Sequence, residues 1–366
     1  MNTFEGHKTA DRGAVSSSRA ADKPQVLRLA VVVVTYETRE LLREFLLSLR
    51  TEIQSLPGVA VTVLVVDNAS TDGTVDMVRT EFPEVRVVAN AANFGPARAF
   101  NQGLAEVLPD ADLVLLANSD VYIHVGTLKR MVEFLGNHPE VDGCCGRLYN
   151  PDGTPQFTRT RIVSLWPVSK DKPHRATFPG TGFSMIRASA FARIGGFDET
   201  YYFYNEDLDW AERARKAGLR FEYIPDASVI HYGNQGRRHN VSRIRRELYR
   251  ANLYYYRRHY PVLAPLAYVG QLLALRWGQW LRRRWLGKLH VQRGTTGSGG
   301  PSDGATAEAA ATSELASEAA RWQQELADLE AAIERLREEY RNPTAPQIPT
   351  FEISTSGLRL AELTPE

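Results

Sequence analysis

Four short runs of valine and leucine constrain this fold more than any other feature of the chain. Each run has the length of a β-strand and leads into a polar turn, at residues 27–34, 61–66, 85–89 and 113–117. Stretches with helix-compatible apolar spacing lie between the runs, at residues 38–49, 73–81 and 97–107. Strands that alternate with helices form parallel sheets covered on both faces. The sequence therefore predicts an α/β fold.

The 366-residue chain is long enough for one main domain with appendages. We expect the α/β domain at residues 26–235, after a disordered leader at residues 1–25. Four further segments are expected to follow: a basic, aromatic helical extension (236–293), a flexible linker (294–310), a heptad helix (311–342) and an irregular tail (343–366).

Charge is distributed unevenly, although the net charge is only +1. Residues 237–293 contain 14 Lys and Arg against one acid, whereas residues 302–366 contain 13 acids against 5 basic residues. The only cysteines, Cys144 and Cys145, are adjacent and unsuited to pair with each other. With no disulfide framework and no signal peptide, a cytoplasmic location is expected.

An apolar stretch at residues 262–281 approaches the length of a membrane span. Arg276 and two glutamines disfavour burial in lipid, whereas tryptophans at 277, 280 and 285 favour a helix lying in the membrane interface. We therefore expect peripheral contact with an anionic membrane, at its inner face. Packing on the α/β domain is the main alternative. Because the arginines are mixed with apolar residues, no nucleic-acid partner is expected.

A heptad pattern runs through residues 315–340, where apolar residues recur at alternating spacings of four and three. It ends before Asn342-Pro343, a plausible helix stop. The pattern predicts a coiled-coil seam, which we expect to join two chains in a homodimer. Folding back on the same chain is the alternative.

Polar side chains follow each predicted strand, where ligands bind in sheets of this kind. They are Thr35, Tyr36 and Glu37 after the first run, Asp67 after the second, Asn93 and Gly95 after the third, and Asn118 and Asp120 after the fourth. Asp67 is not needed as a helix cap, because residues 70–72 can serve, so it can accept a hydrogen bond from the imide of uracil or thymine. Asp120 is either a ligand for Mg²⁺ or Mn²⁺ or an ordinary turn aspartate.

The densest acidic group lies farther along the chain. The run Gly195-Gly196-Phe197-Asp198-Glu199 precedes Glu206, Asp207, Asp209 and Trp210, and His231 follows. Carboxylates are costly in such an aromatic and apolar setting unless they react or hold a cation. Upstream, the small residues Gly180-Thr181-Gly182 allow a ligand to approach the backbone.

These motifs, in this order, resemble a family 2 glycosyltransferase of the GT-A fold, in particular its bacterial rhamnosyltransferase-like branch. The resemblance spans residues 29–260 and rests on Val34-Thr35-Tyr36, the run from Asp67 to Gly73, Asn93-Phe94-Gly95, Asn118-Ser119-Asp120, Gly195–Glu199, Glu206-Asp207-Leu208-Asp209 and His231. It implies a Rossmann-like, mostly parallel sheet flanked by helices, here with a helical extension and a short coiled-coil tail. It also implies sugar transfer with inversion at the anomeric carbon.

The resemblance assigns roles to the motifs. Nucleotide binding is implied for Thr35, Tyr36, Glu37, Asp67, Asn93, Gly95 and Asn118. Mg²⁺ or Mn²⁺ binding is implied for Asp120 and His231, although Asn118 stands where the family's D-x-D motif has its first aspartate. Asp207 matches the catalytic base. Acceptor binding is implied for Glu206, Asp209, Trp210, Gly180, Thr181 and Gly182.

The branch points to dTDP-L-rhamnose as donor and to a glycan or lipid-linked glycan as acceptor, in cell-surface polysaccharide synthesis. UDP-galactose and UDP-GlcNAc stay open, because Asp67 would recognise either pyrimidine. A nucleotidyltransferase is disfavoured, since Thr35-Tyr36-Glu37-Thr38 contains no glycine. A non-catalytic scaffold that acts through the heptad helix is the remaining alternative, and the intact Asp67, Asp120, Asp207 and His231 argue against it.

Overall fold

The computed structural model describes residues 26–156, 171–176, 180–233, 241–296 and 305–351. The predicted leader lies outside these residues, as do residues 297–304 of the predicted linker and residues 352–366 of the tail. The remaining linker residues, 294–296 and 305–310, are helical and not irregular.

The predicted strands form the parallel half of one sheet. β1 (Leu27–Thr35) lies between β2 (Val59–Asp67) and β4 (Leu113–Asn118), and β3 (Arg86–Ala89) pairs with β2. Beyond β4 the sheet is mixed and continues through β8 (Phe183–Arg187), β6 (Gly143–Tyr149), β9 (Phe221–His231) and β5 (Val121–Ile123), while β7 (His174–Ala176) pairs with β9. The α/β prediction is confirmed.

Helices cover both faces of the sheet, because successive side chains of β1 point to opposite sides. Val31 and Val33 pack in one core with α1 (Arg39–Gln54), α2 (Thr74–Glu81) and α4 (Thr127–Asn137). Val32 packs in a second core with α3 (Pro96–Val107), α5 (Ala188–Ile194) and α6 (Glu206–Lys216). Because both cores are dry, the strand is an unbroken apolar run instead of an alternating one. Two short 3₁₀ turns, η1 (Leu108–Asp110) and η2 (Pro261–Leu263), complete the described helices.

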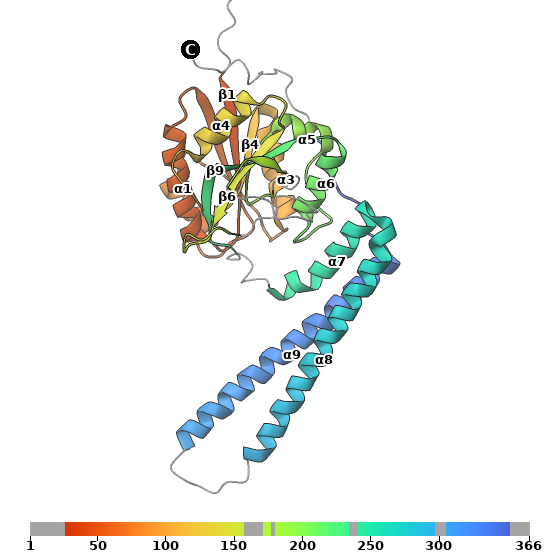
Figure 1. Cartoon of the computed structure of the whole chain (residues 1–366). Helices are drawn as coiled ribbons and strands as arrows, with labels where there is room; N and C mark the ends of the chain where they lie inside the picture. The colour runs from red at the N-terminus through yellow and green to blue at the C-terminus, as the bar shows by residue number, and fades with distance from the viewer. Residues whose placement is uncertain (1–25, 157–170, 177–179, 234–240, 297–304, 352–366) are drawn as a thin grey trace, which may run out of the picture.

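The C-terminal extension is a helical hairpin joined to the domain through α7 (Figure 1). α7 (Val241–His259) packs on the α/β domain, and α8 (Ala264–Thr296) and α9 (Ala305–Arg341) run side by side away from it. The heptad residues Leu329, Ile333 and Leu336 are buried in one cluster with Leu253 of α7 and Leu275 of α8. Over this stretch the heptad seam is occupied within the chain, as in the fold-back alternative, because the partner helices are tethered and their effective concentration is high. A homodimer stays a prediction.

The described part of the tail is irregular, as predicted, yet it docks on the α/β domain. The amides of Gly196 and Glu199 donate to the carbonyls of Pro349 and Gln347 at 2.9 and 2.8 Å. A Cβ atom at Gly195 would lie 2.6 Å from the Pro349 oxygen, so glycine is what permits this approach. The Gly195–Glu199 motif thus lies under a segment from the other end of the chain.

Candidate active site

The carboxyl ends of β1, β2 and β4 bring three predicted residues to one edge of the sheet. Thr35 is in register with Asp67, and Val34 is in register with Asn118. Asp67 is buried, and its Oδ2 accepts a hydrogen bond of 2.9 Å from the amide of Ser70. Its Oδ1 is also buried and has no partner among the described residues. Burial raises the pKa of this carboxyl. Because buried acceptors in proteins are normally hydrogen-bonded, Oδ1 is a candidate contact for a ligand donor.

The turns after β1, β2 and β4 are tied to one another by side chains. The amide of Glu37 donates to Ser70 Oγ at 2.9 Å, and the Glu37 carboxylate accepts from the amide of Thr71 at 2.8 Å. Thr35, Thr38 and Ser119 form a buried hydroxyl chain with spacings of 2.9 and 2.7 Å. Tyr36 is half-buried in the same turn. These contacts preorganise the edge before any ligand arrives.

Asp120 and His231 come together next to Asn118. Asp120 Oδ1 lies 3.4 Å from His231 Nε2, and the amide nitrogen of Asn118 lies 3.5 Å from the same imidazole nitrogen. The other imidazole nitrogen, Nδ1, lies 2.8 Å from Gln156 Oε1, which orients the ring. Within the part of the chain that the structure describes, no group of three or more His, Cys, Asp or Glu side chains is placed to hold a metal. The pair alone would leave most positions around an ion to other ligands.

Gly95 lies between the sheet edge at Asp67 and the acidic segment. The side-chain amide of Asn68 donates to the Gly95 carbonyl at 3.2 Å, and Asn93 Oδ1 accepts from the Gly95 amide at 3.0 Å. On the other side, a Cβ atom at Gly95 would lie 2.1 Å from the Tyr202 carbonyl oxygen. This glycine, with φ of +84°, is therefore required for chain packing, and nucleotide contact through Asn93 and Gly95 stays a prediction.

Glu206 and Asp207 occupy the first turn of α6, directly after a strained loop. Tyr204 and Asn205 both have φ of +68°, a rare conformation for residues with side chains. Burial raises the pKa of Glu206 to about 8, with a further contribution from the charge of Asp207, and burial raises the pKa of Asp207 to about 6. Glu206 Oε2 is buried and has no partner among the described residues. One carboxyl of this pair is poised to accept a proton near neutral pH.

Two predicted acceptor contacts are wrong. Trp210 is buried in the core, where its indole nitrogen donates to the Gly195 carbonyl at 3.0 Å. Asp209 is fully buried, and both of its oxygens are occupied: Oδ2 by Arg213 at 2.8 Å and Oδ1 by His259 at 2.7 Å. On a helix, Asp209, two positions after Asp207, points to the opposite side. Trp210, three positions after Asp207, is not turned away from it, but its large ring packs in the core against Phe191 and Phe197.

The small residues Gly180, Thr181 and Gly182 lead into β8, which lies antiparallel to β4. The Gly182 carbonyl accepts from the amide of Asn118 at 3.0 Å, and a Cβ atom at Gly182 would lie 3.8 Å from the Asn118 side chain. The run therefore borders the Asn118–Asp120 turn. Acceptor contact at these residues stays a prediction.

Several further residues shape the site, and the sequence assigns none of them a role. Gln156 orients His231, and Asn101 of α3 accepts from the amide of Phe197 and donates to its carbonyl, both at 2.9 Å. Arg258 and His259 reach the acidic segment from α7. Asn101 belongs to Asn101-Gln102-Gly103, a further piece of the family resemblance, whereas Gln156 and the two α7 residues carry no motif.

Sequence comparisons with known proteins point to one enzyme family. The sequence profile of glycosyl transferase family 2 matches residues 30–198, and that described as the N-terminal domain of galactosyltransferase matches residues 165–235. The N-acetylglucosaminyl-diphospho-decaprenol L-rhamnosyltransferase of Mycobacterium tuberculosis is 31% identical over 236 residues, which cover 56% of this chain and 76% of the relative. Rhamnosyltransferase WbbL of Escherichia coli is 41% identical over 56 residues, or 15% of this chain and 21% of the relative. Among solved structures, residues 1–349 of S. aureus TarS share 21% identity and a TM-score of 0.47, over 62% of this chain and 66% of that one.

Proposed function

Because the chain belongs to glycosyl transferase family 2, we propose that it transfers L-rhamnose from dTDP-rhamnose to a hydroxyl of a lipid-linked glycan in cell-surface polysaccharide synthesis. One observation carries this proposal: Gly95 contacts both the Asp67–Asn68 turn and the loop that leads to Glu206 and Asp207. Asp67, the proposed hydrogen-bond acceptor for the nucleotide base, and Asp207, the proposed proton acceptor, therefore lie on either side of Gly95. The sugar and the acceptor class are suggested by the rhamnosyltransferase relative, whose name includes an N-acetylglucosaminyl-diphospho-decaprenol.

The nucleotide half of the site follows from Asp67. A uracil or thymine ring presents one imide N–H, and the buried Asp67 Oδ1 has no other donor among the described residues. Leaving such an acceptor unpaired costs about 1–3 kcal/mol, which binding of the ring would recover. Cytosine lacks this N–H at neutral pH, so the site favours uridine and thymidine donors.

Transfer is proposed to proceed by direct displacement. The ionised Asp207 removes the proton of the acceptor hydroxyl as that oxygen forms a bond to the anomeric carbon. The bond from that carbon to the diphosphate oxygen breaks on the opposite face, so the configuration inverts. The raised pKa of Asp207 suits this role, because it makes the carboxylate a better proton acceptor near neutral pH. Glu206, beside it, lends Oε2 to a second acceptor hydroxyl.

A divalent metal is proposed at Asp120 and His231. The Asp120 carboxylate and the His231 imidazole are an oxygen and a nitrogen donor of the type that Mn²⁺ accepts, and the Asn118 side chain lies beside them. Phosphate oxygens of the donor and water would fill the other positions around the ion. When bound, the ion neutralises charge on the diphosphate. Gln156 holds the His231 ring in place for that contact.

A donor screen tests the proposal. We expect thermal stabilisation by dTDP-rhamnose in the presence of Mn²⁺, since a ligand at a hundred times its Kd stabilises by about 2.7 kcal/mol. Asp67→Asn replaces one carboxylate oxygen by an N–H donor and should weaken dTDP binding, while Asp76→Asn, exposed on α2, serves as the matched control. Transfer of rhamnose to a GlcNAc-diphospho-polyprenol analogue should follow. Stabilisation by a GDP-sugar alone would contradict the pyrimidine assignment.

A UDP-sugar is the second candidate donor. The galactosyltransferase profile matches residues 165–235, the segment that carries Glu206 and Asp207. UDP-galactose and UDP-GlcNAc therefore belong in the same thermal-stability screen. If either stabilises the protein more than dTDP-rhamnose does, that nucleotide sugar becomes the proposed donor.

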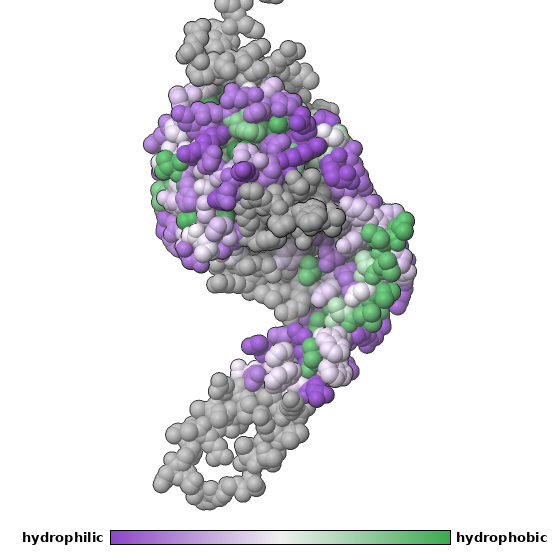
Figure 2. Space-filling model, in the orientation of Figure 1, coloured by the Kyte–Doolittle hydropathy of each residue, from purple (hydrophilic) through white to green (hydrophobic). Residues whose placement is uncertain are grey.

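We also propose that α8 rests on an anionic membrane surface, where a lipid-linked acceptor would lie. Its residues Leu266, Leu273 and Trp277 are 70%, 65% and 63% exposed, and apolar side chains gather along this helix in Figure 2. Trp277 stacks on Trp280 at 5.0 Å, and Arg284 lies over the Trp280 ring at 5.4 Å. Aromatic rings beside arginines suit the headgroup layer of an acidic bilayer. Among the described residues, no helix is both long and apolar enough to cross a membrane.

Vesicle sedimentation tests the membrane contact. The wild-type chain should bind vesicles containing phosphatidylglycerol more tightly than vesicles of phosphatidylcholine alone. Trp277→Ser with Trp280→Ser should abolish this difference, whereas Val125→Ser, which removes an apolar side chain that is 78% exposed on the α/β domain, should not. Equal binding to both vesicle types would contradict an electrostatic contribution. If the chain binds neither vesicle type and light scattering shows a dimer, the exposed apolar side chains of α8 would instead contact a second copy of the chain.

A further inference from the structure

Two fully buried carboxylates bracket the segment that carries the proposed base. Asp198 lies in the loop after α5, and Asp209 lies in the first turns of α6; neither side chain has any exposed surface. Between them lie the strained loop, Glu206 and Asp207. Burying two charges is costly unless each is paired and hydrogen-bonded, so their partners decide how firmly this segment is held.

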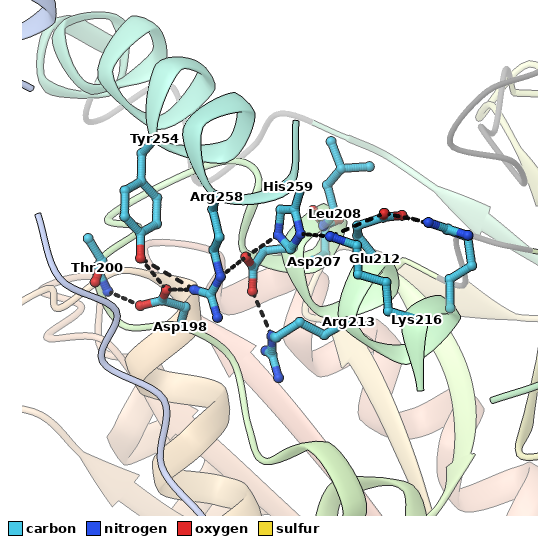
Figure 3. A network of polar contacts seen from close by, with 12 residues as sticks. Asp198, Thr200, Asp207, Leu208, Glu212, Arg213, Lys216, Tyr254, Arg258 and His259 are labelled. Carbon is cyan, nitrogen blue, oxygen red and sulfur yellow. Dashed lines mark hydrogen bonds and ion pairs between the residues drawn. The ribbon is translucent and has the colours of Figure 1, made fainter. Parts of the chain in front are cut away.

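One arginine from α7 pairs with both. The Arg258 guanidinium contacts Asp198 through Nη1 (Figure 3). Its Nε lies 3.3 Å from Asp209 Oδ1. The Arg258 side chain is only 18% exposed. A planar guanidinium fixes two carboxylates at a set separation, which a flexible ammonium does less well. Arg258 is therefore a cross-link between the two ends of the segment.

Neighbouring side chains on α7 complete the clamp. The Tyr254 hydroxyl donates to Asp198 Oδ2 at 2.7 Å. Lys216 Nζ lies 3.2 Å from His259 Nδ1 and donates to it, which leaves Nε2 of His259 to donate to Asp209 at 2.7 Å. Positions 254 and 258 are one helical turn apart, so they present one face of α7 to the acidic segment.

The inner side of the segment is closed as well. Arg213 donates to Asp209 and to the carbonyls of Ile194 and Gly196, the latter two at 2.5 and 2.6 Å. The tail contributes the Gln347 amide, which donates to Asp198 Oδ1 at 2.9 Å. Burial alone would raise the pKa of Asp198, but the hydrogen bonds from Tyr254, Gln347 and Thr200 outweigh it and hold the pKa below its usual range.

We propose that Arg258 is a positioning residue for the transfer reaction: by linking Asp198 to Asp209 it fixes the first turn of α6, and with it Asp207, relative to the acceptor hydroxyl. This inference rests on the proposed function of Asp207. It makes α7, which follows the segments matched by the two family profiles, part of the support of the active site.

The test compares Arg258→Met and Arg258→Lys with Arg257→Met. Arg257 is the matched control, because it points to the other side of α7 and donates to the carbonyls of Glu339 and Tyr340, both at 2.7 Å. Arg258→Met should lower kcat about 100-fold, since a small displacement of a reacting group costs that much. The affinities of Arg258→Met for UDP and dTDP, measured by calorimetry, should change by less than about twofold. That is the size of effect expected when the substituted residue is distant from the binding site. Arg258→Lys should recover part of kcat, and Arg257→Met should stay close to wild type.

Hydrogen exchange gives a readout that needs no activity. Amides of residues 205–210 should exchange faster in Arg258→Met, whereas Arg257→Met should affect α9 and leave them protected. If the wild type transfers no sugar to any acceptor, the proposed function is wrong. Hydrogen exchange at residues 205–210 still tests whether Arg258 fixes the first turn of α6. If Arg258→Met does not fold, Tyr254→Phe removes one contact to Asp198 and should show the same changes to a smaller degree. Unchanged exchange at 205–210, or equal loss of kcat in Arg257→Met, would overturn the inference.

Discussion

Asp120 Oδ1 lies 3.4 Å from Nε2 of His231, a contact between the turn after β4 and the last residue of β9. It arises because β5 begins directly after Asp120 and pairs antiparallel with β9, which sets Val121 opposite His231. The backbone strengthens the junction, since the Tyr232 amide donates to the Asp120 carbonyl at 2.9 Å. The two side chains are thus held together by sheet register and not by their own attraction.

Removal of divalent metal should stop transfer. EDTA is expected to suppress the rate by a factor of about 100 or more, because charge on the departing diphosphate is then uncompensated, and added Mn²⁺ should restore it. His231→Gln should raise the Mn²⁺ concentration needed for half-maximal rate. The exposed His138→Gln is the control. A rate that is indifferent to EDTA would remove the metal from the proposal.

Asp207→Asn should nearly abolish transfer while leaving nucleotide binding intact. The amide cannot accept the acceptor proton, and loss of a general base costs about 10²–10⁴ in rate. Radiolabelled donor in a single-turnover assay measures the rate, and calorimetry with dTDP measures binding. Substantial turnover in this variant would rule out Asp207 as the base.

The activity should rise with pH through about 6. Asp207 must be ionised to accept a proton, and burial raises the pKa of this carboxyl to about 6, so the acid limb of kcat lies above that of an ordinary aspartate. A limb near pH 4 would show that Asp207 is solvated or that another group serves as the base.

Glu206→Gln should make stability less dependent on pH. The pKa of Glu206 is raised by burial from 4.5 to about 8, so the folded state binds this proton more tightly than the unfolded state does. Stability from this group is complete below pH 4.5 and is lost as pH rises toward 8. The glutamine variant is neutral throughout, and its Tm should exceed that of the wild type at pH 8 but not at pH 4.5. Equal Tm differences at both pH values would contradict the buried, protonated state.

Leu336→Ala should destabilise the hairpin by about 2–5 kcal/mol, the usual cost of emptying a buried leucine site. Leu336 is fully buried against α7 and α8, whereas Leu273 on α8 is 65% exposed, so Leu273→Ala should cost less than about 0.5 kcal/mol. Urea unfolding followed by α-helical circular dichroism compares the two. Light scattering should give the mass of one chain for the wild type; a dimer that Leu336→Ala dissociates would reinstate the intermolecular seam.

Much of the sheet edge around Asp67 could be predicted from the sequence, because the ends of apolar strands are visible in it. A run of valines that stops at Thr35 or Asp67 must place the next polar residue at the sheet edge, whatever packs around it. Asp209 and Trp210 were misassigned for the opposite reason. They share a short acidic motif with Asp207, but Asp209 lies on the opposite side of the helix, where Arg213 and His259 pair with it. The Trp210 ring packs in the core against Phe191.

By itself the sequence determined the first four strands and the three helices between them, the polar turns after β1, β2 and β4, and the acidic residues at the start of α6. These are local properties, because apolar period and turn chemistry act over a few residues. Only the tertiary structure decided that α9 folds back on its own chain, that the tail covers Gly195, and that Arg258 joins Asp198 to Asp209. Such contacts link residues far apart in the chain, and an arginine, a heptad or a glycine has many partners that satisfy it equally well until the fold selects one.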